Sequence, residues 1–205
     1  MSDFASMTKW SLAIALGLSF TRPSDLTIKQ PNAGTATTFH NVHWSGQAFV
    51  SPLYYVVRVG YGDAALDFTH YKIIAAVHQT VHETGVWQGQ PVDGDAPVDA
   101  RVQHFEISHG VNALALVGIV HDPAKRGFYA GGGPLIYLSH AESTVGGNDA
   151  QWGYGHSGYG FEVFSGVGMP APWAEVKYDE GRVTVGVAGG TATVPLQTLH
   201  VSIAP

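Results

Sequence analysis

The chain has 205 residues, of which 13% are charged and 45% are apolar, a formal net charge of −6, and no Cys. Soluble domains carry about 25% charged residues, so this chain has too few charges to cover an ordinary water-exposed surface. The negative charge, without a basic cluster, argues against a nucleic-acid partner. The lack of Cys excludes disulfides and thiol chemistry. The length fits a single domain spanning residues 1–205.

Transmembrane helices would explain so few charges, but the longest apolar run, residues 113–120, is much shorter than the roughly 20 residues that a spanning helix needs. In lipid, every backbone polar group needs a partner within the protein, so a spanning chain without such helices must close its strands into a barrel. The N-terminal residues contain no signal peptide, and we expect that a natural one has been replaced by an initiator Met.

The clearest element is residues 10–20, where large apolar residues alternate with small neutral ones. This period of two over a membrane-crossing length is typical of a barrel strand whose small side chains line a narrow interior. Seven further strands are expected at residues 53–61, 64–77, 101–120, 128–142, 155–168, 173–178 and beyond, and 192–203. A change of apolar phase between Leu196 and Leu199 predicts a bulge in the last strand.

The connections alternate in length along the chain. Those at 62–63, 121–127 and 169–172 are short, whereas those at 31–52, 82–100, 143–154 and 181–191 are long. In an up-and-down barrel, this alternation puts the short turns at the end that holds both termini, which is the periplasmic end of outer-membrane barrels. The sequence therefore predicts an eight-stranded antiparallel up-and-down transmembrane β-barrel in the outer membrane of a Gram-negative-type bacterium.

Aromatic residues are expected to form two girdles at the two membrane–water interfaces. The predicted periplasmic girdle contains Trp10, Tyr61, Phe128, Tyr129 and Trp173. The predicted outer girdle contains Tyr71, Tyr137, Tyr159 and Tyr178.

Six charged residues fall opposite the large apolar residues of their strands, which predicts that they point into the barrel interior. They are Arg58, Asp67, Glu106, Glu162, Glu175 and Lys177. Small barrels fill their interiors with ionic networks whose members satisfy one another. A packing role is therefore the main interpretation, with ion conduction or catalysis as alternatives. A pore is disfavoured because eight strands leave a lumen that side chains fill.

The His residues are distributed unevenly along the predicted barrel. His121 and His200 are predicted at the periplasmic end, whereas nine fall in the outer half, namely His40, His43, His70, His78, His82, His104, His109, His140 and His156. Imidazoles close to carboxylates suit Zn, Fe or Cu. Solvated or hydrogen-bonded His residues are the alternative interpretation.

From these residues we predict a candidate site in the outer half. The phase of His70 matches that of Leu66 and Phe68, so it should face lipid, where a polar group is costly without a polar partner. The predicted catalytic residues are His70, His140 and Glu142. The predicted metal ligands are His40, His43, His70, His140 and Glu142, with the first loop folding over the site.

Several segments together resemble the outer-membrane barrel family that includes lipid A oxidase. The most specific are Phe-His-x-Val-x-Trp at 39–44, Asp-Phe-Thr-His-x-Lys at 67–72 and Ala-Glu-x-Lys at 174–177. The resemblance also covers 52–58, 105–116, the glycines at 131–133, and His-Ala-Glu at 140–142. It implies an outer-membrane location, and the named enzyme oxidises the proximal glucosamine of lipid A to an aminogluconate with dioxygen.

Two functions remain open from the sequence. The first is an enzyme that oxidises lipid A in the outer leaflet of the bilayer, surrounded by lipopolysaccharide, with a divalent transition metal, Fe or Cu, as cofactor. The second is a non-catalytic barrel with a structural or partner-docking role, although the loops identify no protein partner. A lipid A deacylase is disfavoured because Ser108 and His109 are adjacent and should point to opposite faces of their strand.

Overall fold

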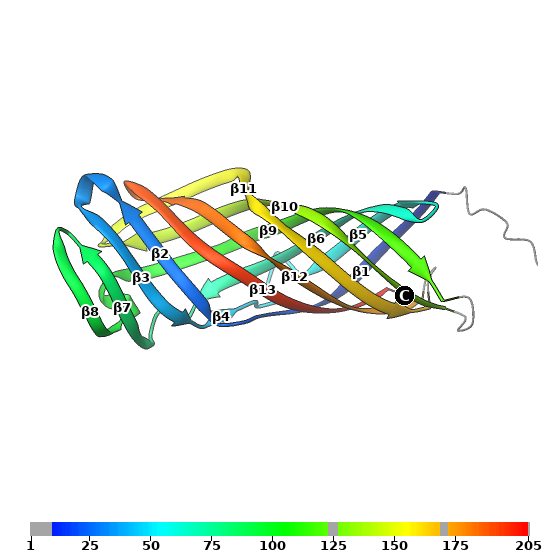
Figure 1. The fold of residues 1–205 in the computed structure, drawn as a ribbon, viewed down its shortest axis with the longest axis horizontal. Coiled ribbons are helices and arrows are strands. Elements are labelled where there is room, and N and C mark those ends of the chain that lie inside the picture. The colour runs from blue at the N-terminus through cyan, green and yellow to red at the C-terminus, as the bar shows by residue number, and fades with distance from the viewer. Residues whose placement is uncertain (1–9, 123–126, 169–171, 205) are drawn as a thin grey trace, which may run out of the picture.

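The structure is a computed structural model of the chain that describes residues 10–122, 127–168 and 172–204. Eight antiparallel strands form a closed ring, in which β13 pairs with β1. They are β1 (Trp10–Thr21), β5 (Tyr55–Tyr61), β6 (Ala64–Ala75), β9 (Val102–His121), β10 (Phe128–Val145), β11 (Asn148–Val167), β12 (Trp173–Val187) and β13 (Gly190–Ala204). The predicted eight-stranded antiparallel up-and-down fold is confirmed (Figure 1).

Five shorter strands extend the barrel at the end away from the termini (Figure 1). They are β2 (Ser24–Gln30), β3 (Thr35–Val42), β4 (Trp44–Ser45), β7 (Thr80–Trp87) and β8 (Gln90–Pro97), with the 3-10 turns η1 (Pro31–Ala33) and η2 (Val98–Ala100). The order β13-β2-β3-β7-β8 continues the sheet from β13, so the first two long connections form wall rather than loop. Among the described residues, no helix is long and apolar enough to cross a membrane.

The other two connections that the sequence predicts to be long, 143–154 and 181–191, are in fact short turns, so this prediction is wrong. β10 and β11 join at Gly146–Gly147, and β12 and β13 join at Ala188–Gly189. β9 and β11 each contain 20 residues, about twice the 9–11 residues that a strand needs to cross a bilayer. The residues that were expected to form these loops therefore extend the strands. Of the predicted short turns, 62–63 is a turn, and most of 121–127 and 169–172 lies outside the described residues.

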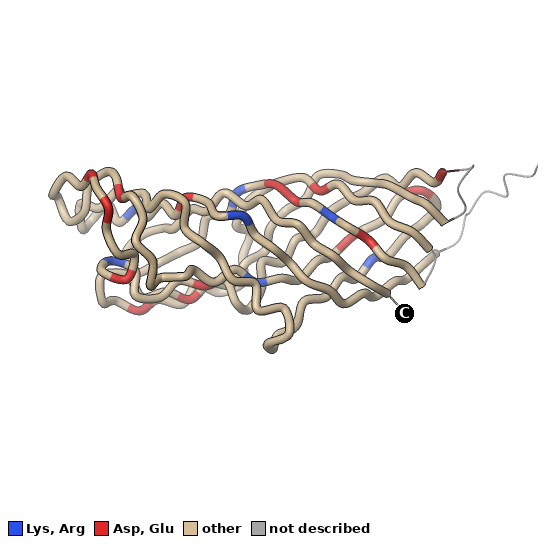
Figure 2. Tube along the Cα trace, turned by 90° about the horizontal axis from the view of Figure 1, so that it is seen from below, with Lys and Arg blue, Asp and Glu red and all other residues tan. Residues whose placement is uncertain are grey.

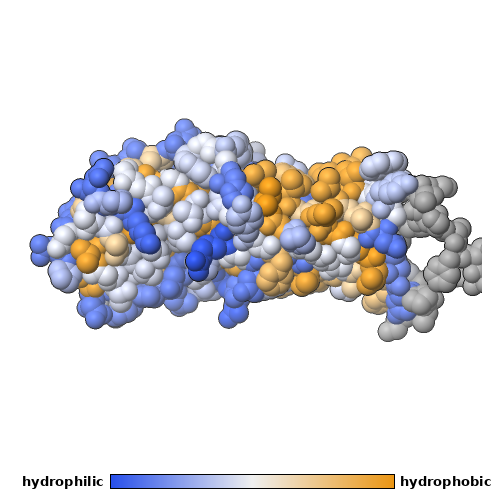
Figure 3. All heavy atoms as spheres, turned by 45° about the horizontal axis from the view of Figure 1, so that its top comes forward, coloured by the Kyte–Doolittle hydropathy of each residue, from blue (hydrophilic) through white to orange (hydrophobic). Residues whose placement is uncertain are grey.

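A belt of apolar side chains covers the outside of the half that holds the termini (Figure 3). On β1 the exposed residues include Trp10, Leu12, Ile14 and Leu16, and Trp10 is 76% exposed. Neighbouring strands continue the belt with Leu66, Leu116, Val163, Val176 and Ile203. Exposed apolar areas this continuous are rare on soluble proteins and are typical of barrels that face lipid.

The polarity of the two faces reverses half-way along the barrel. On β12, the residues that point inward near the termini are charged, namely Glu175, Lys177 and Asp179. In the half away from the termini, the inward residues Val183 and Val185 are apolar. The reversal on β13 produces the change of phase in the sequence, because Leu196 belongs to the inner apolar face and Leu199 to the outer one. The predicted bulge there is wrong, since β12 and β13 pair without a register shift.

Beyond this reversal, a conventional hydrophobic core fills the barrel interior. Its members come from both the ring and the added hairpins and include Leu26, Ile28, Phe39, Phe105, Ile107, Val183, Val194 and Leu196, all completely buried. A water-filled pore would be lined with polar groups, so this core supports the expectation that the barrel is not a channel.

An ionic network fills the part of the barrel interior that the apolar belt surrounds. Five of the six charged residues that the sequence predicts to point inward belong to it. Arg58 pairs with Asp67 and, at 2.7 Å, with Glu175, while Lys177 lies 2.8 Å from Asp67 and 3.6 Å from Glu162. In Figure 2, basic and acidic residues of this layer lie close together in the half near the C-terminus.

Glu106 is the exception, and its predicted place in the lumen is wrong: it lies on the outer face, opposite Glu142. The sequence also missed two members of the network. Asp179 lies 3.2 Å from the imidazole of His200 and accepts a hydrogen bond from Tyr71. His200, predicted at the periplasmic end, is thus fully buried within the polar layer.

The predicted aromatic girdles are only partly correct. Trp10, Tyr61, Phe128 and Tyr159 lie on the outer surface. Four of the nine residues instead point into the barrel and are buried, namely Tyr71, Tyr129, Tyr137 and Trp173. Tyr129 donates a hydrogen bond to Glu175 at 3.0 Å and Tyr71 donates one to Asp179 at 3.0 Å, so these two rings belong to the interior network rather than to the interface.

Replacing Arg58 tests how much the barrel depends on this network. Arg58→Leu leaves Asp67 and Glu175 buried without their shared cation, and breaking a buried pair in this way costs about 3–5 kcal/mol. The variant should unfold at a clearly lower temperature than wild type when heated in detergent, as followed by gel migration. The exposed Arg182→Leu is the control and should behave as wild type. Equal stability of both variants would show that the network is not needed.

Candidate functional site

On four neighbouring strands, the outward-facing side chains change from apolar to polar at one height. His70 follows Phe68 on β6, and His140 follows Leu138 on β10, while Asn112 on β9 and His156 on β11 occupy the same level. The register fixes this alignment, because His70 pairs with Asn112, and Leu138 pairs with both Asn112 and His156. The polar outward residues therefore begin where the apolar belt ends.

His70 faces outward as predicted, yet it is almost completely buried by its neighbours. Its ring stacks on Tyr55, with centroids 5.0 Å apart and planes 11° apart. Its Nδ1 lies 2.8 Å from Asn112 Oδ1, and the Asn112 amide nitrogen donates to the Leu138 carbonyl at 2.9 Å. That second bond identifies Oδ1 as the acceptor, so His70 Nδ1 must be the donor. In neutral His70 the lone pair therefore lies on Nε2, which is buried and has no hydrogen-bond partner among the described residues.

A bulge in β9 brings further polar residues onto the same outer face. Between Ile107 and Val111, β9 has three residues, where β6 has only one between their partners Ile73 and Tyr71. Gly110 allows the bulge, with a φ of +120° that glycine tolerates. A Cβ on Gly110 would also lie 2.5 Å from His70 Cε1. Bulges often redirect side chains next to functional sites.

Because of this bulge, Ser108 and His109 both lie on the outer face, so the prediction that they point to opposite faces is wrong. The Ser108 hydroxyl donates to Glu106, and His109 lies beside Glu142. A hydrolytic serine needs an adjacent base to accept its proton. The pairing of Ser108 with a carboxylate does not supply the serine–histidine dyad that a deacylase would use.

His70 lines a groove of about 650 Å³ on the outer wall. The groove is bounded by Ser51, Pro52, Tyr55, Phe68, His70, His109, Asn112 and Tyr154. Its rim includes part of the connection between β4 and β5, which Lys72 holds by a 2.7 Å hydrogen bond to the Val50 carbonyl. On this connection Phe49 is 78% exposed, and Val50 and Leu53 are also exposed. The groove thus combines polar groups with an apolar rim.

A cluster of possible metal ligands adjoins the groove and shares His109 with it. The ligand atoms of His109, His140 and Glu142 all lie within 4.8 Å of one another, as do those of His104, Glu106 and Glu142. His109 Nδ1 lies 3.3 Å from a Glu142 oxygen. Two His and one carboxylate form a ligand set typical of non-haem iron sites, so the first group fits such a metal.

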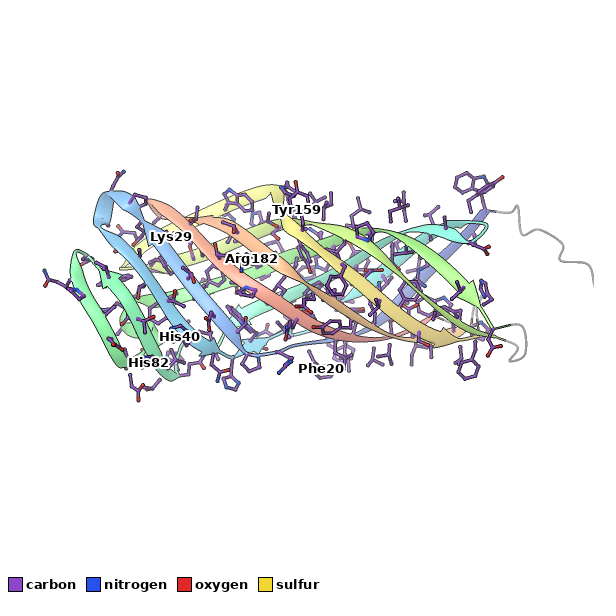
Figure 4. All side chains as sticks on the ribbon, viewed as in Figure 1. Phe20, Lys29, His40, His82, Tyr159 and Arg182 are labelled. Atoms are coloured by element: carbon purple, nitrogen blue, oxygen red, sulfur yellow. The ribbon has the colours of Figure 1, made fainter. Side chains whose placement is uncertain are left out.

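The structure brings together only part of the predicted site. His140 and Glu142 share the cluster, and His70 lies nearby in the groove. His40 instead lies on the added hairpins, where its two ring nitrogens contact Asp25 and Thr84 and its ring stacks on His82 (Figure 4). His43 is exposed in the short connection between β3 and β4. The predicted five-ligand set is therefore not assembled.

Sequence reasoning missed Asn112, His109 and Tyr154 as members of the site. Tyr154 donates a 2.6 Å hydrogen bond to the His109 carbonyl and lies against His140. The pair His109–Gly110 was the available signal, because a glycine inside a strand often marks a bulge. A bulge there would have reversed the inferred direction of His109.

Comparison with protein-family models gave no match, and comparison with curated proteins gave none either. Among solved structures, the crystal structure of Neisserial surface protein A (NspA) matches with a TM-score of 0.44 and 9% sequence identity. The match covers 95% of this chain and 98% of that one. The resemblance to the family that includes lipid A oxidase therefore stays a prediction.

The hydrogen bond from His70 to Asn112 can be tested directly. In ¹⁵N NMR spectra of the folded protein, His70 should be the Nδ1–H tautomer near neutral pH. Asn112→Leu removes the acceptor and should produce a mixture of tautomers, because the Nε2–H tautomer is generally preferred in water. Asn148→Leu, at the distant start of β11, should leave the spectrum unchanged. A wild-type spectrum dominated by Nε2–H would contradict the assignment.

Proposed function

We propose that this protein is a barrel of the outer membrane of a Gram-negative-type bacterium that oxidises lipid A at the groove on its outer wall. The observation that carries the proposal is the position of the groove, directly at the edge of the apolar belt. The hydrocarbon chains of a lipid would contact the belt, and its sugars would lie at the level of His70 and His109. A polar site facing lipid is costly and therefore generally functional.

The barrel's direction follows from its two ends. Outer-membrane barrels keep short turns and termini in the periplasm and larger structures outside. The added hairpins and the groove belong to the larger end, so the groove would meet the outer leaflet, whose main lipid is lipopolysaccharide. The exposed apolar side chains of Phe49 and Val50 would lie against acyl chains at the groove's rim.

The proposed reaction converts the proximal sugar of lipid A, with a free anomeric hydroxyl, to an acid. The anomeric carbon loses its hydrogen and the hydroxyl loses its proton, giving a lactone, while dioxygen accepts the two electrons and two protons and becomes hydrogen peroxide. Water then opens the lactone, so that the lipid gains one oxygen atom overall. His70 Nε2, with its lone pair directed by Asn112, is the group that would accept the hydroxyl proton.

Dioxygen reacts slowly with closed-shell organic molecules unless a redox-active centre supplies single electrons. Iron or copper held by His109, His140 and Glu142 would supply that chemistry beside the groove. His109 contributes to both the ligand cluster and the groove, so the substrate and the centre would be neighbours. Tyr154, bonded to the His109 backbone, would fix the position of the bulge.

Mass spectrometry of lipid A tests this function. Cells that lack a lipid A oxidase, but whose lipid A has a free anomeric hydroxyl, should produce lipid A with one added oxygen atom when they express the protein in air. The product should be missing without oxygen. His70→Ala should lower product formation by roughly 100-fold or more, as loss of a general base does, whereas His82→Ala on the distant hairpin should not.

Surface labelling of intact cells would first establish that each variant is folded in the outer membrane. If folded wild-type protein leaves lipid A unchanged in air, the enzymatic proposal is wrong and a non-catalytic structural or partner-docking barrel is the better interpretation.

A further inference from the structure

Two carboxylates face each other on the outer wall, and within the described part of the chain neither forms an ion pair with a Lys or Arg. Glu106 on β9 and Glu142 on β10 are direct cross-strand partners, and both side chains lie on the outer face. Like charges in directly opposite positions destabilise a sheet. The basic residues of the interior, Arg58 and Lys177, are on the other side of the wall. Lys72, on the neighbouring strand β6, attracts Glu106 electrostatically, but its ammonium group donates its hydrogen bond to the Val50 carbonyl. A bound metal ion would balance the negative charge that remains on the two carboxylates.

His side chains flank the pair on both sides. His104 Nε2 lies 3.6 Å from Glu106, and His109 Nδ1 lies 3.3 Å from Glu142. His140 completes the group next to His109, with ring centroids 4.7 Å apart, and its buried Nδ1 has no hydrogen-bond partner in the part of the chain that the structure describes. Glu142 belongs to both ligand groups, the one with His109 and His140 and the one with His104 and Glu106.

We propose that this part of the wall binds two divalent transition-metal ions, with the Glu142 carboxylate bridging them. One ion takes His109, His140 and one Glu142 oxygen, and the other takes His104, Glu106 and the second oxygen. Each ion then has three protein ligands, which leaves positions open for water or substrate, as in catalytic sites. The first ion is the centre of the proposed function, and only the second ion and the bridge go beyond it.

Neighbouring groups orient the two carboxylates for this role. The Ser108 hydroxyl donates to Glu106 Oε1, which leaves Oε2 toward His104. Gln151 donates to Glu142 Oε1 at 3.0 Å. Hydrogen bonds to ligating carboxylates are a general feature of metal sites, because they fix the direction of the lone pairs. The two-residue bulge of β9 supplies His109, without which only one group of ligands would form.

Protonated His residues could neutralise the carboxylates instead, and pH separates the two explanations. Metal ligands must be deprotonated, so ion binding strengthens as pH rises. The experiments below therefore use pH 8.

The first experiment counts ions. Untagged full-length protein, folded in detergent, is equilibrated with Co²⁺ alone at pH 8, and bound cobalt per chain is measured by mass spectrometry. Wild type should bind two ions. Glu106→Gln and His104→Ala should each bind one, as should His140→Ala, whereas Glu142→Gln should lose both. His156→Ala, on the same face but outside both groups, should still bind two.

One or no ion in wild type overturns the proposal, and so does Glu142→Gln retaining two ions or His156→Ala losing one. These outcomes are independent of lipid chemistry. Two bound ions without oxidation of lipid A would overturn the proposed function alone, whereas oxidation with a single bound ion would overturn only the second site.

The second experiment measures stability and also reports on folding. Without metal, Glu142→Gln should unfold at a temperature roughly 1–3 °C above wild type, because the like-charge pair is removed. Added Co²⁺ should raise the unfolding temperature of wild type but not that of Glu142→Gln. If metal-free Glu142→Gln is less stable than wild type, or if both respond equally to Co²⁺, the bridge is wrong.

Discussion

The structure depends on one constraint, which is that the barrel must present opposite polarities to its surroundings at its two ends. In the half with the termini the outer face is apolar, so the ionisable groups Arg58, Asp67, Glu175 and Lys177 are confined to the interior, where they have to neutralise one another. In the other half the outer face is polar and the interior is a hydrophobic core. A single wall meets both requirements because strand residues alternate between faces.

The reversal places polar groups on the outside at one particular height. A polar side chain lower on the wall would have only lipid around it, and one higher would lie in bulk water, where weak interactions are screened. His70 lies between these two conditions, covered by Tyr55 and hydrogen-bonded to Asn112. His70 can therefore keep one tautomer and remain shielded from water without the full desolvation free energy of placing a polar group in hydrocarbon.

Features of the fold and of the candidate site could be predicted from the sequence where they depend on a local pattern. Alternation is local, so the strands and the outward direction of His70 could be predicted. The interior network was predictable for Arg58, Asp67, Glu162, Glu175 and Lys177, because their phase opposes a lipid-facing residue. Phase becomes ambiguous where polarity reverses, which explains the false bulge near Leu196. The same reversal explains Glu106, because its large apolar neighbours Phe105 and Ile107 belong to the interior core rather than to the lipid-facing belt. Phase also fails within a real bulge, which explains His109. Long connections gave no signal of their own, so His40 was assigned to the wrong part of the molecule.

The outer position of the candidate site also suits the proposed action of a small barrel on a lipid. Its interior is filled at one end by ion pairs and at the other by apolar side chains, so no substrate has to enter it. A lipid substrate that diffuses in the plane of the membrane would reach the wall from the side, with its sugars at the height of the proposed site. Binding then requires only lateral approach, and the rigid ladder of β9 and β10, rather than a mobile loop, sets the positions of His109, His140 and Glu142.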